Sequence, residues 1–211
     1  MKTKPAKKVL VNIGCGVTVL PGFINIDKYF TADQLKEGAK TKQGLCGNAS
    51  FPPKGKFVQG DILALPLKDN SVDYVECLEM LEHLPWRDVE LAVFEIYRVL
   101  KEGGKATICV PDLDDMCLTW TEKVAGKKFD REMFFTLAQQ FYGSQLHDGE
   151  YHTSAFNRVY LTGLLQACGF PAKNIKVTEY PHGSHPPKFK GAFWNPTSYL
   201  IIGMLTAEVK K

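Results

Sequence analysis

The stretch from Val9 to Asp27 reads VLVNIGCGVTVLPGFINID, and it decides the fold. It begins with an apolar run, Val9 to Val11, of the kind found in strands that are buried on both faces. Gly14 and Gly16 then interrupt the run. Glycine permits a positive φ and carries no Cβ, so a ligand can lie directly against the backbone. Because parallel strands end at one edge of a sheet, we expect a ligand contact at the two glycines and an Asp27 carboxylate that accepts two hydrogen bonds from a ribose diol.

Two glycines after a strand are weak evidence by themselves. The third glycine of the dinucleotide-binding fingerprint is absent, and nothing resembles the GxxxxGK[ST] phosphate loop. The pair could therefore form no more than a turn. The order of the downstream segments decides between these interpretations.

Length and composition predict one α/β domain. A chain of 211 residues with 45% hydrophobic residues can bury a full core, so we take residues 1–211 as a single domain. The net charge of +3 is too small to indicate a nucleic-acid-binding protein. No apolar run approaches the roughly 18 residues that cross a bilayer, so we expect no membrane partner.

Two features favour a cytoplasmic protein. Residues 1–8 are basic but lack the apolar region of a signal peptide, and we expect them to form a flexible tail. The six cysteines include no CxxC pair, which favours a reducing compartment.

Residues 28–56 show no helical or strand periodicity. We expect a long loop there, with at most one helical turn near 33–39. Lysines outnumber acidic residues in this segment, so it is either a solvated insertion or a lid that meets an anionic substrate. A strand is expected next, over 57–62. Asp61 at its end could accept the amino group of a purine whose ring packs on Ile62 and Leu63, or it could cap the following turn.

Hydrophobic periodicity predicts the remaining elements. Strands are expected over 72–78, 106–110, 175–180 and 198–205. Helices are expected from Pro85 to the glycines at 103–104, and over 113–125, 130–142 and 158–168, the last capped by Asn157.

The segments VLVNIGCG, FINID, GDILALP, DNSVDYVECLEMLEHL, FEIYRVLKEGGKATICVPD and LLQACGF, in this order, resemble class I S-adenosylmethionine-dependent methyltransferases of the type 11-like group. The resemblance runs from Val9 to Phe170, and it is the combination that is specific. It implies a Rossmann-like α/β fold, with a seven-stranded, mostly parallel sheet of order 3-2-1-4-5-7-6 that is flanked by helices and has strand 7 antiparallel. It also implies S-adenosyl-L-methionine as the cofactor.

The resemblance assigns cofactor contacts one position at a time. Asn12 stands where many members have Asp or Glu, so a contact near the methionine amine is weakened. The short spacing from Gly16 to Asp27 predicts a tight loop over 17–22 in place of a helix. The implied contacts are Gly14, Cys15 and Gly16 for the methionine end, Asp27 for the ribose, Asp61, Ile62 and Leu63 for the adenine, and Glu79 with Met80 for the middle of the cofactor.

Residues 79–83, with the sequence EMLEH, carry the candidate catalytic and metal-binding groups. In one helical turn, Glu79, Glu82 and His83 would share a face. Two carboxylates and an imidazole suit a divalent ion such as Mn²⁺, or Mg²⁺ if waters complete its shell. The ExxEH pattern resembles small-RNA 3′-terminal 2′-O-methyltransferases and ubiquinone-pathway O-methyltransferases, whose metal holds a vicinal diol or catechol.

The RNA enzymes take a further histidine from just before a later helix. His152 stands at the corresponding place here, with His147 as the fallback. A structural interpretation stands beside the metal: Glu82 could favour a helix N-terminus while His83 only forms a hydrogen bond. Without a metal, His83 or His152 becomes the candidate general base, because an imidazole titrates near neutrality.

Three functions stay open. The first is an O-methyltransferase for a hydroxylated small molecule, and a saccharide acceptor is favoured because similar compact family members serve saccharide pathways. The second is a nucleic-acid or nucleotide methyltransferase, and the third is a non-enzymatic cofactor-binding protein. A second long loop, 181–195, combines basic and aromatic residues that could stack a base or sugar, or form an ordinary loop or dimer contact. We expect a monomer or homodimer.

Overall fold

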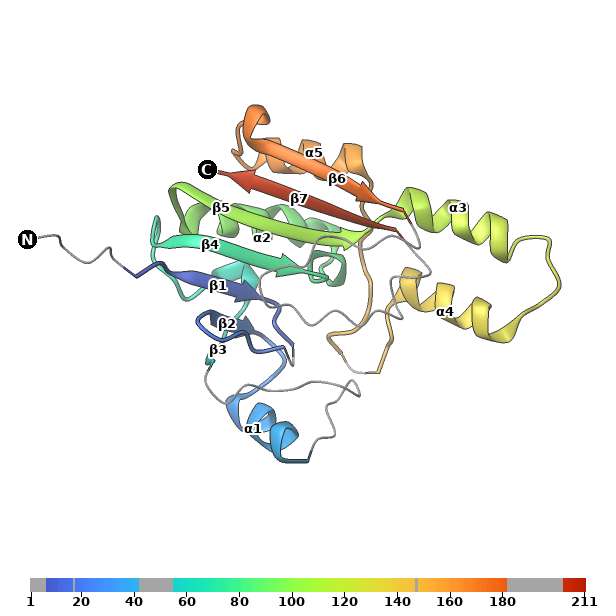
Figure 1. Ribbon diagram of the computed structural model, residues 1–211, viewed down its shortest axis with the longest axis horizontal. Coiled ribbons are helices and arrows are strands. Elements are labelled where there is room, and N and C mark those ends of the chain that lie inside the picture. Colours follow the sequence, from blue (N-terminus) through green and yellow to red (C-terminus); the bar gives the residue numbers. More distant parts are fainter. Residues whose placement is uncertain (1–6, 17, 42–54, 147, 182–202) are drawn as a thin grey trace, which may run out of the picture.

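The protein folds around a seven-stranded sheet of order β3-β2-β1-β4-β5-β7-β6 (Figure 1). The computed structural model describes residues 7–16, 18–41, 55–146, 148–181 and 203–211. From β3 to β5 the neighbouring strands are parallel, and β7 is antiparallel to both β5 and β6. The strand order and directions implied by the family resemblance are confirmed.

The elements have the following bounds. The strands are β1 (Leu10–Ile13), β2 (Ile24–Asp27), β3 (Lys56–Gln59), β4 (Val72–Leu78), β5 (Leu100–Pro111), β6 (Ile175–Tyr180) and β7 (Met204–Lys210). The α-helices are α1 (Ala32–Thr41), α2 (Trp86–Val99), α3 (Leu113–Lys123), α4 (Arg131–Tyr142) and α5 (Arg158–Ala167). Three 3₁₀ turns are η1 (Ile62–Ala64), η2 (Leu81–His83) and η3 (Ala172–Asn174).

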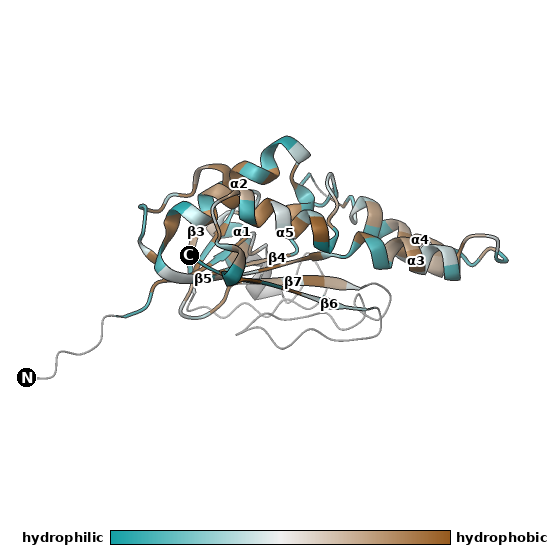
Figure 2. Cartoon of the chain, turned by 90° about the horizontal axis from the view of Figure 1, so that it is seen from above, coloured by the Kyte–Doolittle hydropathy of each residue, from teal (hydrophilic) through white to brown (hydrophobic). Residues whose placement is uncertain are grey.

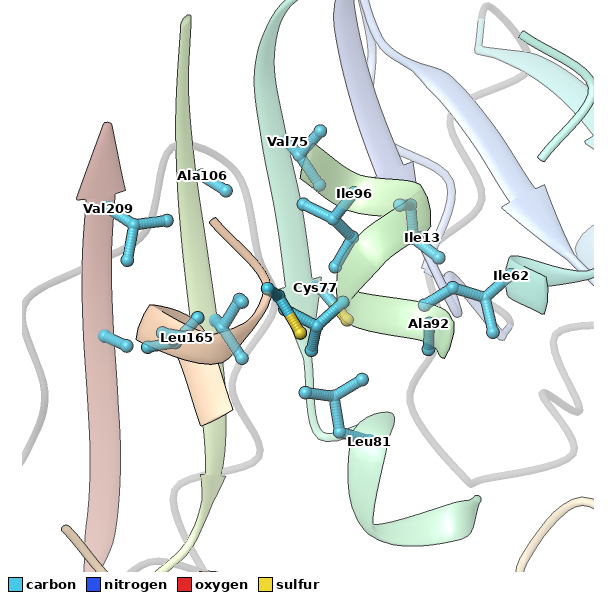
Figure 3. Close-up of a cluster of buried hydrophobic side chains, with 14 of the residues drawn as sticks. Ile13, Ile62, Val75, Cys77, Leu81, Ala92, Ile96, Ala106, Leu165 and Val209 are labelled. Carbon is cyan, nitrogen blue, oxygen red and sulfur yellow. The ribbon is translucent and has the colours of Figure 1, made fainter. Parts of the chain in front are cut away.

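The main core lies between the sheet and helices α2 and α5, which sit on the same side of it (Figure 2). In α2, Val89, Val93 and Ile96 recur at helical spacing and are fully buried. Ile96 meets alternate side chains of the strands, such as Val75, and Leu165 of α5 fills the neighbouring space (Figure 3). This packing fixes the carboxyl ends of the parallel strands.

The connection between β1 and β2 is held by two buried amides. The Asn12 side-chain N–H donates to the Thr18 carbonyl at 3.0 Å and to Asn25 Oδ1 at 3.1 Å. Asn25 in turn binds both the N–H and the carbonyl of Leu20, at 2.7 and 3.1 Å. The tight loop expected over 17–22 is confirmed for its described residues, which contain no helix; Val17 lies outside them.

Helix α2 ends before the expected glycines. It stops at Val99, because Leu100 already has an extended backbone with ψ of 134°. Strand β5 runs through Gly103, whose φ is +77°. The pairing of β4 with β5 also shifts register here, between Val72 and Tyr74. The expectation that the glycine pair ends the helix is therefore wrong: these glycines allow an irregular strand start.

Two other boundaries differ from expectation. Residues 28–56 were expected to hold at most one helical turn, yet α1 occupies ten of them. The last strand was expected over 198–205, whereas the structure has β7 over Met204–Lys210, and 198–202 lie outside the described residues. Leu205, Ala207 and Val209 alternate toward the core, so the strand continues as far as this pattern does.

Helices α3 and α4 form an antiparallel pair that projects beyond the carboxyl ends of the parallel strands (Figures 1 and 2). Met116 and Leu137 are buried between them and the sheet, with Trp120 and Phe141 packed alongside. The chain thus leaves the sheet and returns to it at 143–157. Within the described part of the chain, no helix combines the length and the apolar character needed to cross a membrane.

Candidate functional site

A cleft of about 140 Å³ lies at the carboxyl ends of β1, β2 and β4. This is the edge of a parallel sheet where ligands bind in open α/β folds. The expected cofactor residues that line it are Gly14, Gly16, Asp27, Asp61, Ile62, Glu79 and Met80. The structure therefore brings together residues from four separate segments of the first 80.

The glycine turn after β1 is a backbone surface that Met80 approaches closely. The Gly14 N–H donates to the Ile26 carbonyl at 2.9 Å, which ties the turn to β2. Gly14 has a φ of +65°, and a Cβ placed on it would collide with the Met80 side chain. Gly16 has a φ of +48° and donates its N–H to Asp27 at 2.8 Å. Both glycines are thus required by backbone conformation, and Gly14 also by contact.

The Asp27 carboxylate organises the backbone around the cleft. It accepts hydrogen bonds from the N–H groups of Gly16 at 2.8 Å, Tyr29 at 2.8 Å and Phe30 at 3.2 Å. A carboxylate offers about four acceptor positions, so about one remains. The local backbone therefore occupies most of the acceptor capacity of Asp27, and the two hydrogen bonds expected from a ribose diol stay a prediction.

Three expected cofactor residues do not line the cleft. Asn12 is turned to the amide network under the β1–β2 connection. Cys15 is buried beside its own turn, with Sγ 3.5 Å from the Gly16 carbonyl, and burial raises the pKa of its thiol well above the ordinary value. Leu63 packs against the main core.

Asp61 both lines the cleft and caps the next turn. It accepts the Leu63 N–H at 3.0 Å, which begins η1, and pairs with Lys28 at 2.8 Å. Burial acts to raise the pKa of Asp61, but the hydrogen bonds from Lys28 and Leu63 outweigh it, so the pKa lies below the ordinary value. The capping alternative is confirmed, and the side chain stays at the cleft edge.

Residues 79–83 do not form the single helical turn that would place both carboxylates on one face. Glu79 has a φ of +51°, and only Leu81–His83 form the 3₁₀ turn η2. The Glu79 N–H still pairs with the Cys109 carbonyl of β5 at 2.8 Å, so this residue belongs to the sheet edge. Glu79 consequently lines the cleft, while Glu82 is buried on another side.

One ligand atom each from Glu82, His83 and His152 lie within 4.8 Å of one another. His83 Nδ1 is 3.2 Å from the Tyr151 carbonyl, and His152 Nδ1 is 2.7 Å from the Gln140 carbonyl. A carbonyl can only accept, so each Nδ1 carries the proton and each Nε2 keeps its lone pair. Histidines held in this way are typical metal ligands. Glu79 is not part of this group of three.

The electrostatics of this group depend on burial. Glu82 is 2% exposed, and its Oε2 atom finds no hydrogen-bond partner among the described residues. Burial, reinforced by the charge of Glu79, raises the pKa of the Glu82 carboxyl well above its ordinary range. Burial lowers the pKa of His152, which keeps the imidazole neutral near pH 7. A buried carboxyl without a partner is costly unless a proton or a cation compensates it.

Sequence reasoning missed the wall on the opposite side of the cleft. Tyr29, Gly149 and Glu150 line it, and a Cβ on Gly149 would lie 2.7 Å from the Tyr29 ring. No motif marks Gly149 or Glu150, because only the return of the chain from the α3–α4 pair brings them here. His147 and the aromatic and basic residues expected to act from 182–195 lie outside the described residues.

Comparisons with known proteins identify the family of this chain. Residues 11–108 match the family model described as a methyltransferase domain. The chain is 32% identical to demethylmenaquinone methyltransferase from Staphylococcus carnosus, over 83% of this chain and 88% of that protein. The chain belongs to the class I S-adenosylmethionine-dependent methyltransferases.

Other relatives share with this chain only a part of their length or only the fold. It is 34% identical to sterol 24-C-methyltransferase from Schizosaccharomyces pombe, over 49% of this chain and 28% of that protein. Indeed, the matches cover only 27–43% of the length of the first curated relatives. A solved methyltransferase from Methanosarcina mazei superimposes with a TM-score of 0.57 at 18% identity, covering 100% of this chain and 99% of that one, which shows the shared fold.

Proposed function

We propose that the protein transfers a methyl group from S-adenosylmethionine to a hydroxyl of a small-molecule acceptor, with a saccharide favoured, and that a divalent ion assists. The observation that carries this proposal is the group of Glu82, His83 and His152, whose ligand atoms lie within 4.8 Å. His83 belongs both to this group and to the lining of the cleft. An acceptor held at the group would therefore lie beside the methyl donor.

The residues present fit a divalent ion. Two imidazoles with fixed Nδ1 protons and a buried carboxylate oxygen form a mixed nitrogen and oxygen donor set, which suits Mn²⁺, Fe²⁺, Co²⁺ or Zn²⁺, and Mg²⁺ when waters complete the shell. Such an ion, when bound, lowers the pKa of a hydroxyl that it coordinates. In this proposal Glu79 contacts the methyl donor and not the ion, because it lines the cleft and lies outside the group of three ligands.

The protein itself contributes position and proton transfer. The methyl of a sulfonium is already activated, so holding the two reactants in line can supply an effective molarity of about 10⁵ M or more. The glycine turn and Met80 on one side, and Tyr29 with Gly149 on the other, define the space for the donor. If no ion is bound, His83 or His152 is the candidate general base: His152, neutral because of its burial, would then accept the hydroxyl proton at Nε2.

Charge argues against a phosphate-bearing acceptor, and so against the nucleic-acid alternative. Among the described residues, four acidic residues line the cleft, Asp27, Asp61, Glu79 and Glu150, together with one lysine, Lys28, which is already paired with Asp61. Among the described residues the cleft is thus acidic, which opposes an anionic ligand.

A second candidate is methylation of a carbon in an apolar ring. It is favoured by the 32% identity with demethylmenaquinone methyltransferase over most of both chains. The cytoplasmic location also remains a proposal. It is supported by the described cysteines, all five of which are free thiols.

The test is turnover of enzyme treated with EDTA and then given Mn²⁺ or Mg²⁺, with formation of S-adenosylhomocysteine as the readout. Saccharides, catechols and quinols serve as the acceptor panel. We expect chelation to abolish O-methylation, and His152→Ala to lower it at least tenfold while His147→Ala does not. Chelator-insensitive activity with an active His152→Ala variant removes the ion from the proposal. Turnover on quinols alone favours the second candidate, and donor binding without any turnover favours a non-enzymatic role.

A further inference from the structure

The segment 149–154 contributes residues both to the methyl-donor cleft and to the proposed metal-ligand group. Gly149 and Glu150 line the donor cleft, and His152 belongs to the ligand group. Only one residue separates Glu150 of the cleft wall from His152 of the ligand group. A movement of the backbone at one of these positions therefore displaces the other.

The same segment is fastened to the 3₁₀ turn η2. Five hydrogen bonds join residues 151–154 to residues 81–83. They run from the Thr153 and Ser154 N–H groups to the Glu82 carbonyl at 2.8 and 3.1 Å, from Thr153 Oγ1 to the His83 carbonyl at 3.1 Å, from Ser154 Oγ to the Leu81 carbonyl at 3.1 Å, and from His83 Nδ1 to the Tyr151 carbonyl at 3.2 Å.

The donor must affect this arrangement. A cleft of about 140 Å³ is smaller than the roughly 300 Å³ of ordinary ligand pockets, and Gly149 rests on the Tyr29 ring across it. A nucleoside that fills this cleft would therefore displace Gly149 and Glu150, which line it together with residues of the 79–84 segment. An ion bound to Glu82, His83 and His152 would bridge the same two segments. The methyl donor and the ion would each hold these two segments in the arrangement that the other one binds. A ligand that finds the segments already ordered binds more tightly, which is positive cooperativity.

We propose that Thr153 and Ser154 are positioning residues that couple donor binding to divalent-ion binding, so that each ligand strengthens the binding of the other. The inference rests on the metal site of the proposed function. Coupling between two sites usually amounts to a factor of about 5 to 150, and it must be the same in both directions.

Isothermal titration calorimetry on the full chain tests this coupling. The Kd of Mn²⁺ is measured with and without saturating S-adenosylhomocysteine, and the Kd of S-adenosylhomocysteine with and without Mn²⁺. The thioether is used because it lacks the sulfonium charge that would repel the ion. We expect at least about fivefold tighter binding in both experiments, by the same factor.

The variant Thr153→Val/Ser154→Ala removes two of the side-chain hydrogen bonds, those to the backbone carbonyls of His83 and Leu81, and replaces no side chain of the cleft or of the ligand group. We expect its coupling factor to fall at least twofold, with each separate Kd nearly unchanged. The control Thr162→Val/Ser71→Ala deletes hydroxyls that bond the Arg158 and Lys68 carbonyls elsewhere, and should couple like wild type. Circular dichroism melts check that both variants fold.

The outcomes separate the two proposals. Mn²⁺ binding that is independent of S-adenosylhomocysteine overturns the coupling and leaves the metal site standing. Coupling that survives equally in the Thr153→Val/Ser154→Ala variant overturns the role of these two residues. Absence of Mn²⁺ binding under both conditions overturns the metal site and the coupling together, while donor binding still reports on the methyltransferase assignment.

Discussion

At the scale of single residues, Gly14 meets two separate requirements. Its φ of +65° is strained for any residue with a Cβ, and a Cβ there would also collide with Met80. Gly16, with a φ of +48°, has open space around it. The pair therefore separates the cost of the backbone conformation, about 1–2 kcal/mol, from the cost of the contact.

We expect Gly14→Ala to weaken S-adenosylhomocysteine binding at least tenfold, because Met80 must move into the cleft. Gly16→Ala should cost stability from backbone strain with a smaller loss of binding. The double variant Gly14→Ala/Met80→Ala should recover part of the affinity, since alanine at position 80 relieves the collision. Calorimetry measures the Kd values, and equal effects of the two single variants would show that Met80 does not matter.

Asp27 stabilises the backbone that surrounds the donor. In Asp27→Asn, an amide N–H₂ would replace one of the oxygens that accept from Gly16, Tyr29 and Phe30. This N–H₂ group would then face a backbone N–H, and two hydrogen-bond donors cannot pair. We expect a loss of about 1–3 kcal/mol in the free energy of unfolding together with weaker binding of the methyl donor. Asp33→Asn on α1 is the control, because the Asp33 side chain is 92% exposed. Denaturant unfolding of both variants gives the comparison; equal stabilities would contradict this role.

At the scale of elements, the sequence predicted what local chemistry determines and failed where the tertiary structure decides. Strand β4 was placed correctly over Val72–Leu78 and β6 over Ile175–Tyr180, because each is a run of residues favoured in strands that follows a turn signal. Helix α2 was extended too far, because nothing local shows that Leu100 pairs with Val72. The helical turn over 79–83 failed for the same reason, since Glu79 pairs with β5.

Helix α2 is also tied to the segment that follows β3. Glu95 accepts the Leu65 N–H at 2.8 Å and binds the Arg98 guanidinium through both oxygens, at 2.6 and 2.7 Å. Arg98 continues to Asp69 at 2.6 Å and to the Leu67 carbonyl at 2.9 Å. This network positions η1, and with it the adenine side of the cleft.

We expect Glu95→Gln to lower the free energy of unfolding by about 1–3 kcal/mol at neutral pH. The Arg98 hydrogen bonds lower the pKa of Glu95 below its ordinary value near 4.5. A carboxyl with a lowered pKa stabilises the fold above its unfolded pKa and loses this contribution as pH falls through the folded pKa. The deficit of the variant should thus be constant above about pH 5.5 and shrink below about pH 4.5.

Denaturant unfolding at several pH values measures this deficit. Glu90→Gln on the same helix is the matched control, since its side chain is exposed and no ion pair of Glu90 occurs among the described contacts. A deficit that persists unchanged at pH 3.5 would show that the charge of Glu95 is not its source.

At the scale of the whole molecule, the cleft joins segments that are far apart in the sequence. The glycine turn, Asp27, Asp61 and the 79–83 segment could be predicted because each follows a strand and carries a recognisable chemical group. Gly149 and Glu150 could not, since their position depends on the length and packing of α3 and α4. One side of the cleft can therefore be predicted from the local sequence, whereas the position of the other side depends on the tertiary fold.

Because both sides of the cleft surround the methyl donor, we expect donor binding to stabilise and protect both of them. A ligand that binds only the native state at 100 times its Kd stabilises it by about 2.7 kcal/mol, or roughly 5–11 °C in Tm for a domain of this size. Hydrogen exchange with S-adenosylhomocysteine should then show protection at residues 14–16 and 60–62, and also at 149–154, although more than 80 residues separate the last two. Gly14→Ala at the same ligand concentration is the control and should show less of both effects. Protection confined to the first 84 residues would mean that the donor does not contact Gly149 and Glu150, and that the cleft wall they form belongs to the acceptor alone.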